Sequence, residues 1–298
     1  MSVTVDPSLV LRLLAADVPS TLHPNLLLAG SLAAAYHYRT DAQREVLTKD
    51  ADLVVQPAGA TSECLETARQ LLEHGWRPTP AMKPGRAESP DDDLTLIRLY
   101  PPNSEIYFVE LMAMPAPAQV PVKTWVRVEL QGTAYDGWYV VPSFRYVSLF
   151  ANDAQRSEVG IHYASPALMA LANMLSHQVV GKTTIAGSNT LRSAKDLGRA
   201  ITLARLATAE DLETWPAKWW AALQAHFVGE ASDLARRAGD GVKALLADGD
   251  ALVQAVELAN TGLLVGRTVT RPQFEIAGEQ LLVLVADLVA SMRSPGRS

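Results

Sequence analysis

Two aspartates, Asp50 and Asp52, stand two residues apart at the start of the apolar, β-branched run 51–56. In an extended strand, side chains two residues apart point to the same side, so we expect both carboxylates to project together. Carboxylate oxygens suit Mg²⁺, which keeps several water ligands and also accepts phosphate oxygens. The spacing therefore predicts a divalent-cation site that could clamp a triphosphate.

A third carboxylate, Glu110, lies inside the otherwise apolar run 106–111. Burying a carboxylate without a partner either shifts its pKa or destabilises the fold. We therefore expect either a metal ion or a hydrogen-bonded cation beside Glu110. If its strand neighbours the one that carries the aspartates, Glu110 becomes the third oxygen ligand of the cation.

Gly30 and Ser31 stand where the predicted buried strand 25–29 meets the predicted helix 31–38. The first backbone N–H groups of a helix and its positive end favour a phosphate, and glycine lets that phosphate approach the backbone closely. The junction is therefore a second candidate contact for a triphosphate.

These features occur in a fixed order along the chain: Gly30-Ser31, Arg39, Thr48-Lys49-Asp50-Ala51-Asp52 and Glu110. In this order they resemble the nucleotidyltransferase fold of the DNA polymerase beta superfamily. The later segment Arg192-Ser193-Ala194-Lys195-Asp196 makes the chain similar to one branch of it, the abortive-infection toxin-type nucleotidyltransferases.

The resemblance implies a catalytic site in which Asp50, Asp52 and Glu110 bind Mg²⁺ or Mn²⁺, and in which Glu110 could deprotonate the attacking hydroxyl. Two metal ions would stabilise the attacking and leaving oxygens as pyrophosphate departs. It also implies contacts to the nucleotide from a wider set: Gly30, Ser31, Arg39, Thr48, Lys182, Lys195 and Asp196.

The activity implied is transfer of a nucleoside monophosphate from a nucleoside triphosphate to a hydroxyl of RNA, a protein or a small molecule. The toxin-type branch further implies an antitoxin partner. One departure from that branch is in helix 167–175, where a lysine is typical and Asn173 stands near its position; Lys182 follows shortly after. The alternative is a catalytically silent nucleotidyltransferase-fold protein that binds or regulates.

The assignments of Arg39, Lys195 and Asp196 also have ordinary structural explanations. Arg39 either contacts phosphate or forms a structural ion pair. Lys195 and Asp196 lie on a predicted amphipathic helix, where charges usually form a solvated face.

The composition narrows the class of protein. The 298 residues are 48% hydrophobic and 19% charged with a net charge of −6, which argues against coating nucleic acid by bulk charge. The single cysteine, Cys64, excludes an internal disulfide and favours a reducing compartment, so we expect the cytoplasm. Residues 1–20 lack a secretory pattern, and the apolar run 281–290 contains Asp287, so we expect no membrane partner.

The two parts of the chain differ in charge and in pattern. Residues 1–165 carry 13 basic and 19 acidic residues, whereas residues 166–298 carry 13 of each. Short β-branched runs give way near residue 166 to long Ala- and Leu-rich stretches of helical period. We expect an α/β (α+β) nucleotidyltransferase-like domain at 1–165, with a mixed β-sheet and flanking helices, and a helical bundle at 166–298.

Periodicity and turn residues also predict individual elements. Strands are expected at 25–29, 51–56, 94–100, 105–113, 125–130, 138–141 and 145–150. Helices are expected at 7–16, 31–38, 61–74, 167–179, 191–206, 215–227, 231–246, 251–259 and 273–292.

Overall fold

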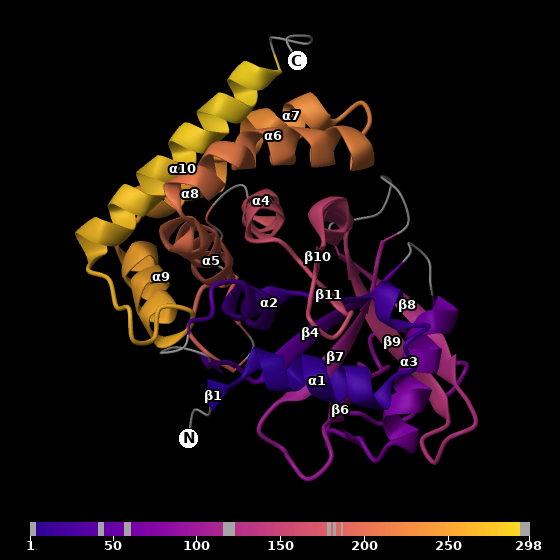
Figure 1. Cartoon of the computed structure of the whole chain (residues 1–298). Coiled ribbons are helices and arrows are strands. Elements are labelled where there is room, and N and C mark those ends of the chain that lie inside the picture. The colour runs from indigo at the N-terminus through magenta and orange to yellow at the C-terminus, as the bar shows by residue number, and fades with distance from the viewer. Residues whose placement is uncertain are drawn as a thin grey trace. The chain divides into compact units, whose positions relative to one another are not determined.

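The computed structural model describes residues 4–40, 45–56, 61–115, 123–177, 180, 183–185 and 187–292 (Figure 1). The chain packs as two compact units. The first unit holds residues 1–148 and 154–164, and the second holds 149–153 and 165–298. Lys182 lies outside the described residues.

A mixed sheet forms the centre of the first unit. Its central strands β4 and β7 run parallel, and β4 also pairs antiparallel with β2. The pairing confirms the expected mixed β-sheet with flanking helices, which is consistent with a nucleotidyltransferase-like fold. Across the described residues the strand order is β10 (Gln155–Arg156), β11 (His162–Tyr163), β2 (Leu26–Leu28), β4 (Asp50–Val55), β7 (Phe108–Ala113), β6 (Arg98–Tyr100), β5 (Arg77–Pro78).

Two small sheets accompany the central one. Strand β1 (Thr4–Val5) pairs with β3 (Val46–Leu47), directly ahead of the aspartates. Strands β8 (Lys123–Leu130) and β9 (Gly137–Phe144) form a long antiparallel pair.

The helices of the first unit are α1 (Pro7–Asp17), α2 (Gly30–His37) and α3 (Thr61–Glu73), with the short 3-10 helix η1 (His23–Asn25) ahead of β2. Helix α1 begins where the Asp6 side chain accepts a hydrogen bond from the Ser8 backbone. Helix α3 buries a stripe that includes Cys64, and this burial raises the pKa of the thiol to about 12.

Residues 145–150 are not the expected strand. They belong to the 3-10 helix η2 (Arg145–Asp153). Its buried side chains are spaced three apart, Tyr146 with Leu149 and Val147 with Phe150, which matches the three residues per turn of a 3-10 helix. A run with aromatic and apolar side chains was therefore mistaken for a strand.

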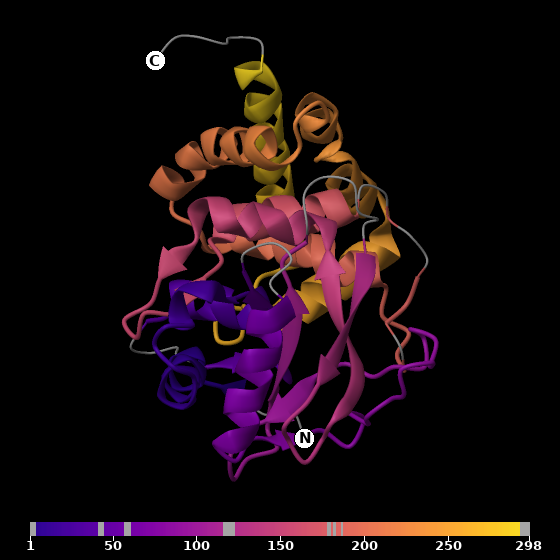
Figure 2. The same ribbon diagram turned by 90° about the vertical axis from the view of Figure 1, so that its right-hand side faces the viewer.

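The second unit is the expected bundle of helices, whose colours run from pink at α4 to yellow at the C-terminal helix in Figure 2. No described helix is both long and apolar enough to cross a bilayer. The helices are α4 (Pro166–Ser176), α5 (Arg192–Leu206), α6 (Ala209–His226), α7 (Ala231–Arg237), α8 (Asp240–Ala247), α9 (Gly249–Thr261) and α10 (Arg271–Ser291).

The prediction of a single helix at 231–246 is wrong, because the segment forms two helices, α7 and α8, separated at Gly239. The Ala238 amide donates to Ala235 O, three residues back, and so closes α7. Glycine carries a helix penalty, and Gly239 lies where an added side chain would meet Leu282 on α10. The break therefore falls at a glycine that packs closely against α10.

Trp219 ties α6 to α4 inside the second unit. Its buried indole Nε1 donates to Ala167 O at 2.7 Å. Replacing Trp219 with Phe leaves that carbonyl buried without this donor, so we expect the free energy of unfolding to fall by about 1–3 kcal/mol. Urea unfolding measures the change. Trp220→Phe, at a half-buried neighbouring position, is the matched control, and an equal loss in both variants would contradict this role of the hydrogen bond.

Candidate functional site

The pairing of β4 with β7 brings the three carboxylates to one face of the sheet. Asp52 lies opposite Glu110, and Asp50 lies opposite Phe108. Residues directly opposite each other on neighbouring strands point to the same face, as do residues two apart. Asp50 is exposed and Asp52 half-buried, whereas the Glu110 side chain is only 13% exposed.

The start of α2 lies against Asp52. The Ala29 amide donates to Asp52 O at 2.8 Å, which extends the β2–β4 pairing up to the helix. Gly30 has φ +68°, and a Cβ there would stand 2.4 Å from Asp52 Oδ2. The backbone conformation at position 30 therefore favours glycine, and any side chain there would also have to displace the Asp52 carboxylate. Gly30 and Ser31 thus open the helix beside the carboxylate.

Thr48 fixes the outer aspartate. Its Oγ1 donates to Asp50 Oδ1 at 2.8 Å. One residue later, Lys49 O accepts from the Phe108 amide at 3.0 Å, which ties the approach to β4 onto β7. The Asp50 carboxylate is therefore held at the edge of the same face by its own segment.

The cation beside Glu110 is Arg98, a residue that the sequence interpretation missed. Arg98 lies opposite Glu110 across the β6–β7 pair, and its Nε donates to Glu110 Oε2 at 2.6 Å. Of the two partners expected for Glu110, the structure contains the hydrogen-bonded cation. The signal was present in the sequence, because Arg98 is the lone basic residue of run 94–100, the first arm of the expected hairpin.

The three carboxylates do not form a ready three-ligand metal centre. Among the residues with described positions, no three or more His, Cys, Asp or Glu side chains gather as a metal site. What the face presents is an aspartate pair next to a glutamate that already has a cationic partner. The metal role of Glu110 therefore stays a prediction.

Arg39 is engaged as a structural ion pair. Its guanidinium donates to Tyr36 O at 2.7 Å, stacks on the Tyr36 ring and pairs with Glu158 at 2.6 Å. Helix α2 lies between Arg39 and Gly30, a separation of about 13 Å at 1.5 Å per residue. The structure therefore does not place the backbone of Arg39 at the carboxylates.

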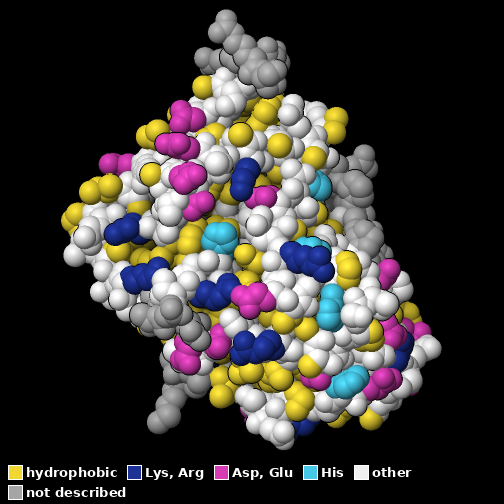
Figure 3. All heavy atoms as spheres, in the orientation of Figure 1, with side chains coloured by type: hydrophobic (Ala, Val, Ile, Leu, Met, Phe, Trp, Pro, Cys, Tyr) yellow, Lys and Arg dark blue, Asp and Glu magenta, His cyan; other side chains and the backbone are white. Residues whose placement is uncertain are grey.

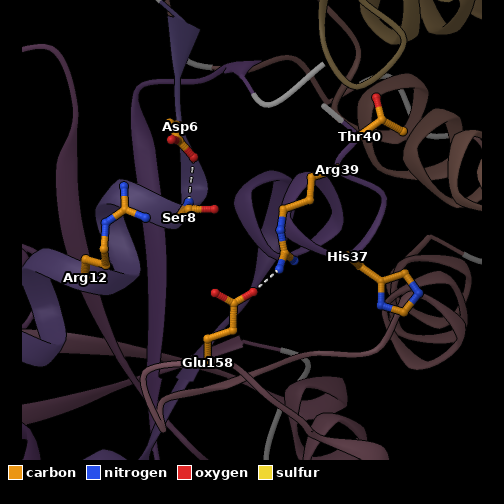
Figure 4. Close-up of a pocket in the computed structure, with 7 residues that line it drawn as sticks. All are labelled: Asp6, Ser8, Arg12, His37, Arg39, Thr40 and Glu158. Carbon is orange, nitrogen blue, oxygen red and sulfur yellow. Dashed lines mark hydrogen bonds and ion pairs between the residues drawn. The ribbon is translucent and has the colours of Figure 1, made fainter. Parts of the chain in front are cut away.

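Arg39 instead borders a polar cavity of about 590 Å³ in the first unit. Figure 4 shows its side chain reaching Glu158 across the space. None of the three carboxylates of the sheet lines this cavity. Its lining residues are Asp6, Ser8, Arg12, His37, Arg39, Thr40 and Glu158.

Lys195 and Asp196 lie on α5 in the second unit. His177 Nε2 donates to Asp196 Oδ2 at 2.7 Å, which links α5 to the end of α4. Burial alone would raise the pKa of Asp196, but the His177 hydrogen bond and the Arg199 charge outweigh it, so the pKa lies below its ordinary value. Asn173 is half-buried on α4.

Charges of both signs are interspersed on the face in Figure 3, where basic side chains lie among acidic and histidine side chains.

Comparisons with known proteins give weak likenesses. No family model and no curated protein matches the chain. The JHP933 protein of Helicobacter pylori is 12% identical with TM-score 0.39, covering 97% of this chain and 94% of that one. A candidate nucleotidyltransferase from H. pylori is 11% identical with TM-score 0.40, covering 99% and 100%. A STING-associated CdnE c-di-GMP synthase from Capnocytophaga granulosa is 10% identical with TM-score 0.24, covering 94% and 79%.

Gly30→Ala tests the contact between α2 and Asp52. Gly75→Ala is the matched control, because Gly75 also has positive φ but an added Cβ there meets nothing within 4 Å. Left-handed strain costs each variant about 1–2 kcal/mol. We expect Gly30→Ala to lose clearly more in urea unfolding, since Asp52 must also move. Equal losses would show that Asp52 yields freely.

Asp196→Asn tests the depressed pKa of Asp196. A carboxyl whose pKa is lower in the folded chain stabilises it fully above the ordinary value of 3.8 and loses that contribution as pH falls through the folded pKa. We expect the variant to unfold about 1–2 kcal/mol more easily at pH 5.5, with the difference shrinking below about pH 4.

Unfolding of both proteins at a series of pH values measures this dependence. The control is Asp233→Asn, which removes a carboxylate that is 69% exposed and paired with Arg236. A loss in Asp196→Asn that stays constant from pH 5.5 to pH 3 would contradict the charge-based explanation.

Proposed function

We propose that the chain is a divalent-cation-dependent nucleotidyltransferase, which moves a nucleoside monophosphate from a nucleoside triphosphate onto a hydroxyl. The observation that supports it most is the placement of Asp50 and Asp52 on one sheet face, with Asp52 directly against the glycine that opens α2. The carboxylate pair can bind a divalent cation, and the backbone N–H groups at the neighbouring helix N-terminus can bind phosphate oxygens.

The residues of the face fit Mg²⁺ or Mn²⁺. Asp50 and Asp52 supply hard oxygen atoms from one strand, and Asp50 is exposed, so a hydrated cation can reach it. Glycine at position 30 places no Cβ of its own beside Asp52 Oδ2. When bound there, the cation supplies positive charge against the phosphate oxygens and the leaving pyrophosphate.

Other groups of the chain would bind the triphosphate, position Asp50 and accept the proton of the attacking hydroxyl. Backbone amides of Gly30 and Ser31 would hold the triphosphate at the start of α2. Thr48 would keep the Asp50 carboxylate in place through the 2.8 Å hydrogen bond. Glu110 would take the proton of the attacking hydroxyl, because its carboxylate lies on the same face of the sheet as the aspartates.

The wider assignments of the nucleotidyltransferase resemblance belong to this proposal as well. Arg39, Lys182, Lys195 and Asp196 are proposed to contact the nucleotide. The acceptor hydroxyl would belong to RNA, a protein or a small molecule, and a toxin role would bring an antitoxin partner. The single cysteine supports a reducing compartment, so we propose the cytoplasm.

A second candidate is a protein of the same fold that binds or regulates but does not transfer. It is favoured by the ion pair between Glu110 and Arg98, which engages the residue proposed as the base. The position of Asn173, where the toxin-type branch has a basic residue, favours it too.

Transfer from labelled nucleotide tests the proposal. The pure protein is incubated with each labelled nucleoside triphosphate, Mg²⁺ or Mn²⁺, and RNA, protein or small acceptors. Because each aspartate would hold the cation, we expect Asp50→Asn and Asp52→Asn to lower transfer at least ~100-fold. Asp92→Asn, at an exposed aspartate in the loop before β6, should transfer like the wild type.

Undiminished transfer in both aspartate variants would place the chemistry elsewhere. Cation-dependent triphosphate binding without any transfer would favour the silent binding protein.

A further inference from the structure

Arg98 and Glu110 form a charge pair that solvent reaches only in part. The Arg98 side chain is 33% exposed and the Glu110 side chain 13% exposed. Their 2.6 Å contact is charge-assisted and lies between two directly paired strands. Because water screens this pair less than an exposed one, the two opposite charges attract each other more strongly than they would at the surface.

The guanidinium also offsets crowded negative charge. Glu110 and Asp52 lie opposite each other on strands about 4.8 Å apart, and like charges in that position repel. Asp50 adds a third carboxylate on the same face, two residues before Asp52. A bound divalent cation would balance the same carboxylates that Arg98 now helps to balance.

We propose that Arg98 competes with the divalent cation for Glu110, so that full loading of the site requires the Arg98–Glu110 ion pair to open. The inference rests on the proposed function, since it takes the aspartate pair to be the cation site. A cation bound by Asp52 and Glu110 together would stand within a few ångströms of the guanidinium, and two positive charges at that distance repel.

Arg98 has a second place to lie once it releases Glu110. Its Cζ already stands 5.2 Å from the centroid of the Phe108 ring, within the range of a cation–π contact. Phe108 is the residue opposite Asp50, so the guanidinium would stay on the same face. Arg98 is thus a positioning residue: it acts on Glu110 and through it on the affinity for the cation.

Mn²⁺ binding to the full chain, followed by electron paramagnetic resonance without nucleotide, tests the competition. If Arg98 competes, Arg98→Gln should bind Mn²⁺ about tenfold more tightly than the wild type. The gain should disappear in Arg98→Gln/Glu110→Gln. Arg77→Gln is the matched control, because Arg77 also lies at this end of the sheet but pairs with Glu105.

Thermal unfolding gives a readout that does not depend on the resonance signal. In EDTA, Arg98→Gln should melt below the wild type, and saturating Mn²⁺ should raise its Tm more than it raises that of the wild type. Arg98→Lys, which keeps the charge but not the Nε donor, should bind Mn²⁺ with an affinity between the other two. It provides the comparison if Arg98→Gln does not fold without metal.

The outcomes separate the two proposals. Binding that is lost in Asp50→Asn, together with equal or weaker binding in Arg98→Gln, overturns the competition alone. Failure of both the wild type and the Arg98 variants to bind Mn²⁺ overturns the aspartate site and the competition together. Tighter binding that persists in the double variant also overturns the competition, since Glu110 would then play no part.

Discussion

The register between β4 and β7 is the constraint on which the site depends. It sets Asp52 opposite Glu110, and the antiparallel pairing of β4 with β2 brings the start of α2 to the same end of the strand. Because side chains alternate between faces, a shift of one residue would send the carboxylates to opposite sides of the sheet. The opposite face of β4 is fully buried at Ala51, Leu53 and Val55, which fixes this register.

Charge is the second constraint, and it follows from the first. A face that collects three carboxylates is costly unless positive charge accompanies them. Arg98 supplies such charge at Glu110, from the strand on the other side of β7. Asp52, Glu110 and Arg98 therefore lie side by side on the three adjacent strands β4, β7 and β6. A divalent cation that binds to the two carboxylates would be repelled by the Arg98 guanidinium.

The sequence was informative about elements and less so about partners. Alternation and apolar spacing located β4, β7 and the start of α2, because a buried strand and a small-residue helix leave clear local patterns. The Arg98–Glu110 contact needed the pairing register of the hairpin, and the Arg39–Glu158 pair joins residues 119 apart. The prediction of a strand at 145–150 was wrong because these residues pack as the 3-10 helix η2. The prediction of one helix at 231–246 was wrong because it overlooked the glycine at position 239, where the chain packs closely against α10.

The central claim is that Asp50 and Asp52 hold a divalent cation beside a triphosphate. The most direct measurement is anomalous diffraction from crystals grown with Mn²⁺ and a non-hydrolysable nucleoside triphosphate. The account predicts a manganese peak within coordination distance of both aspartates, with phosphate density at the start of α2. Triphosphate bound elsewhere in the chain, with no manganese at the aspartate pair, would contradict it.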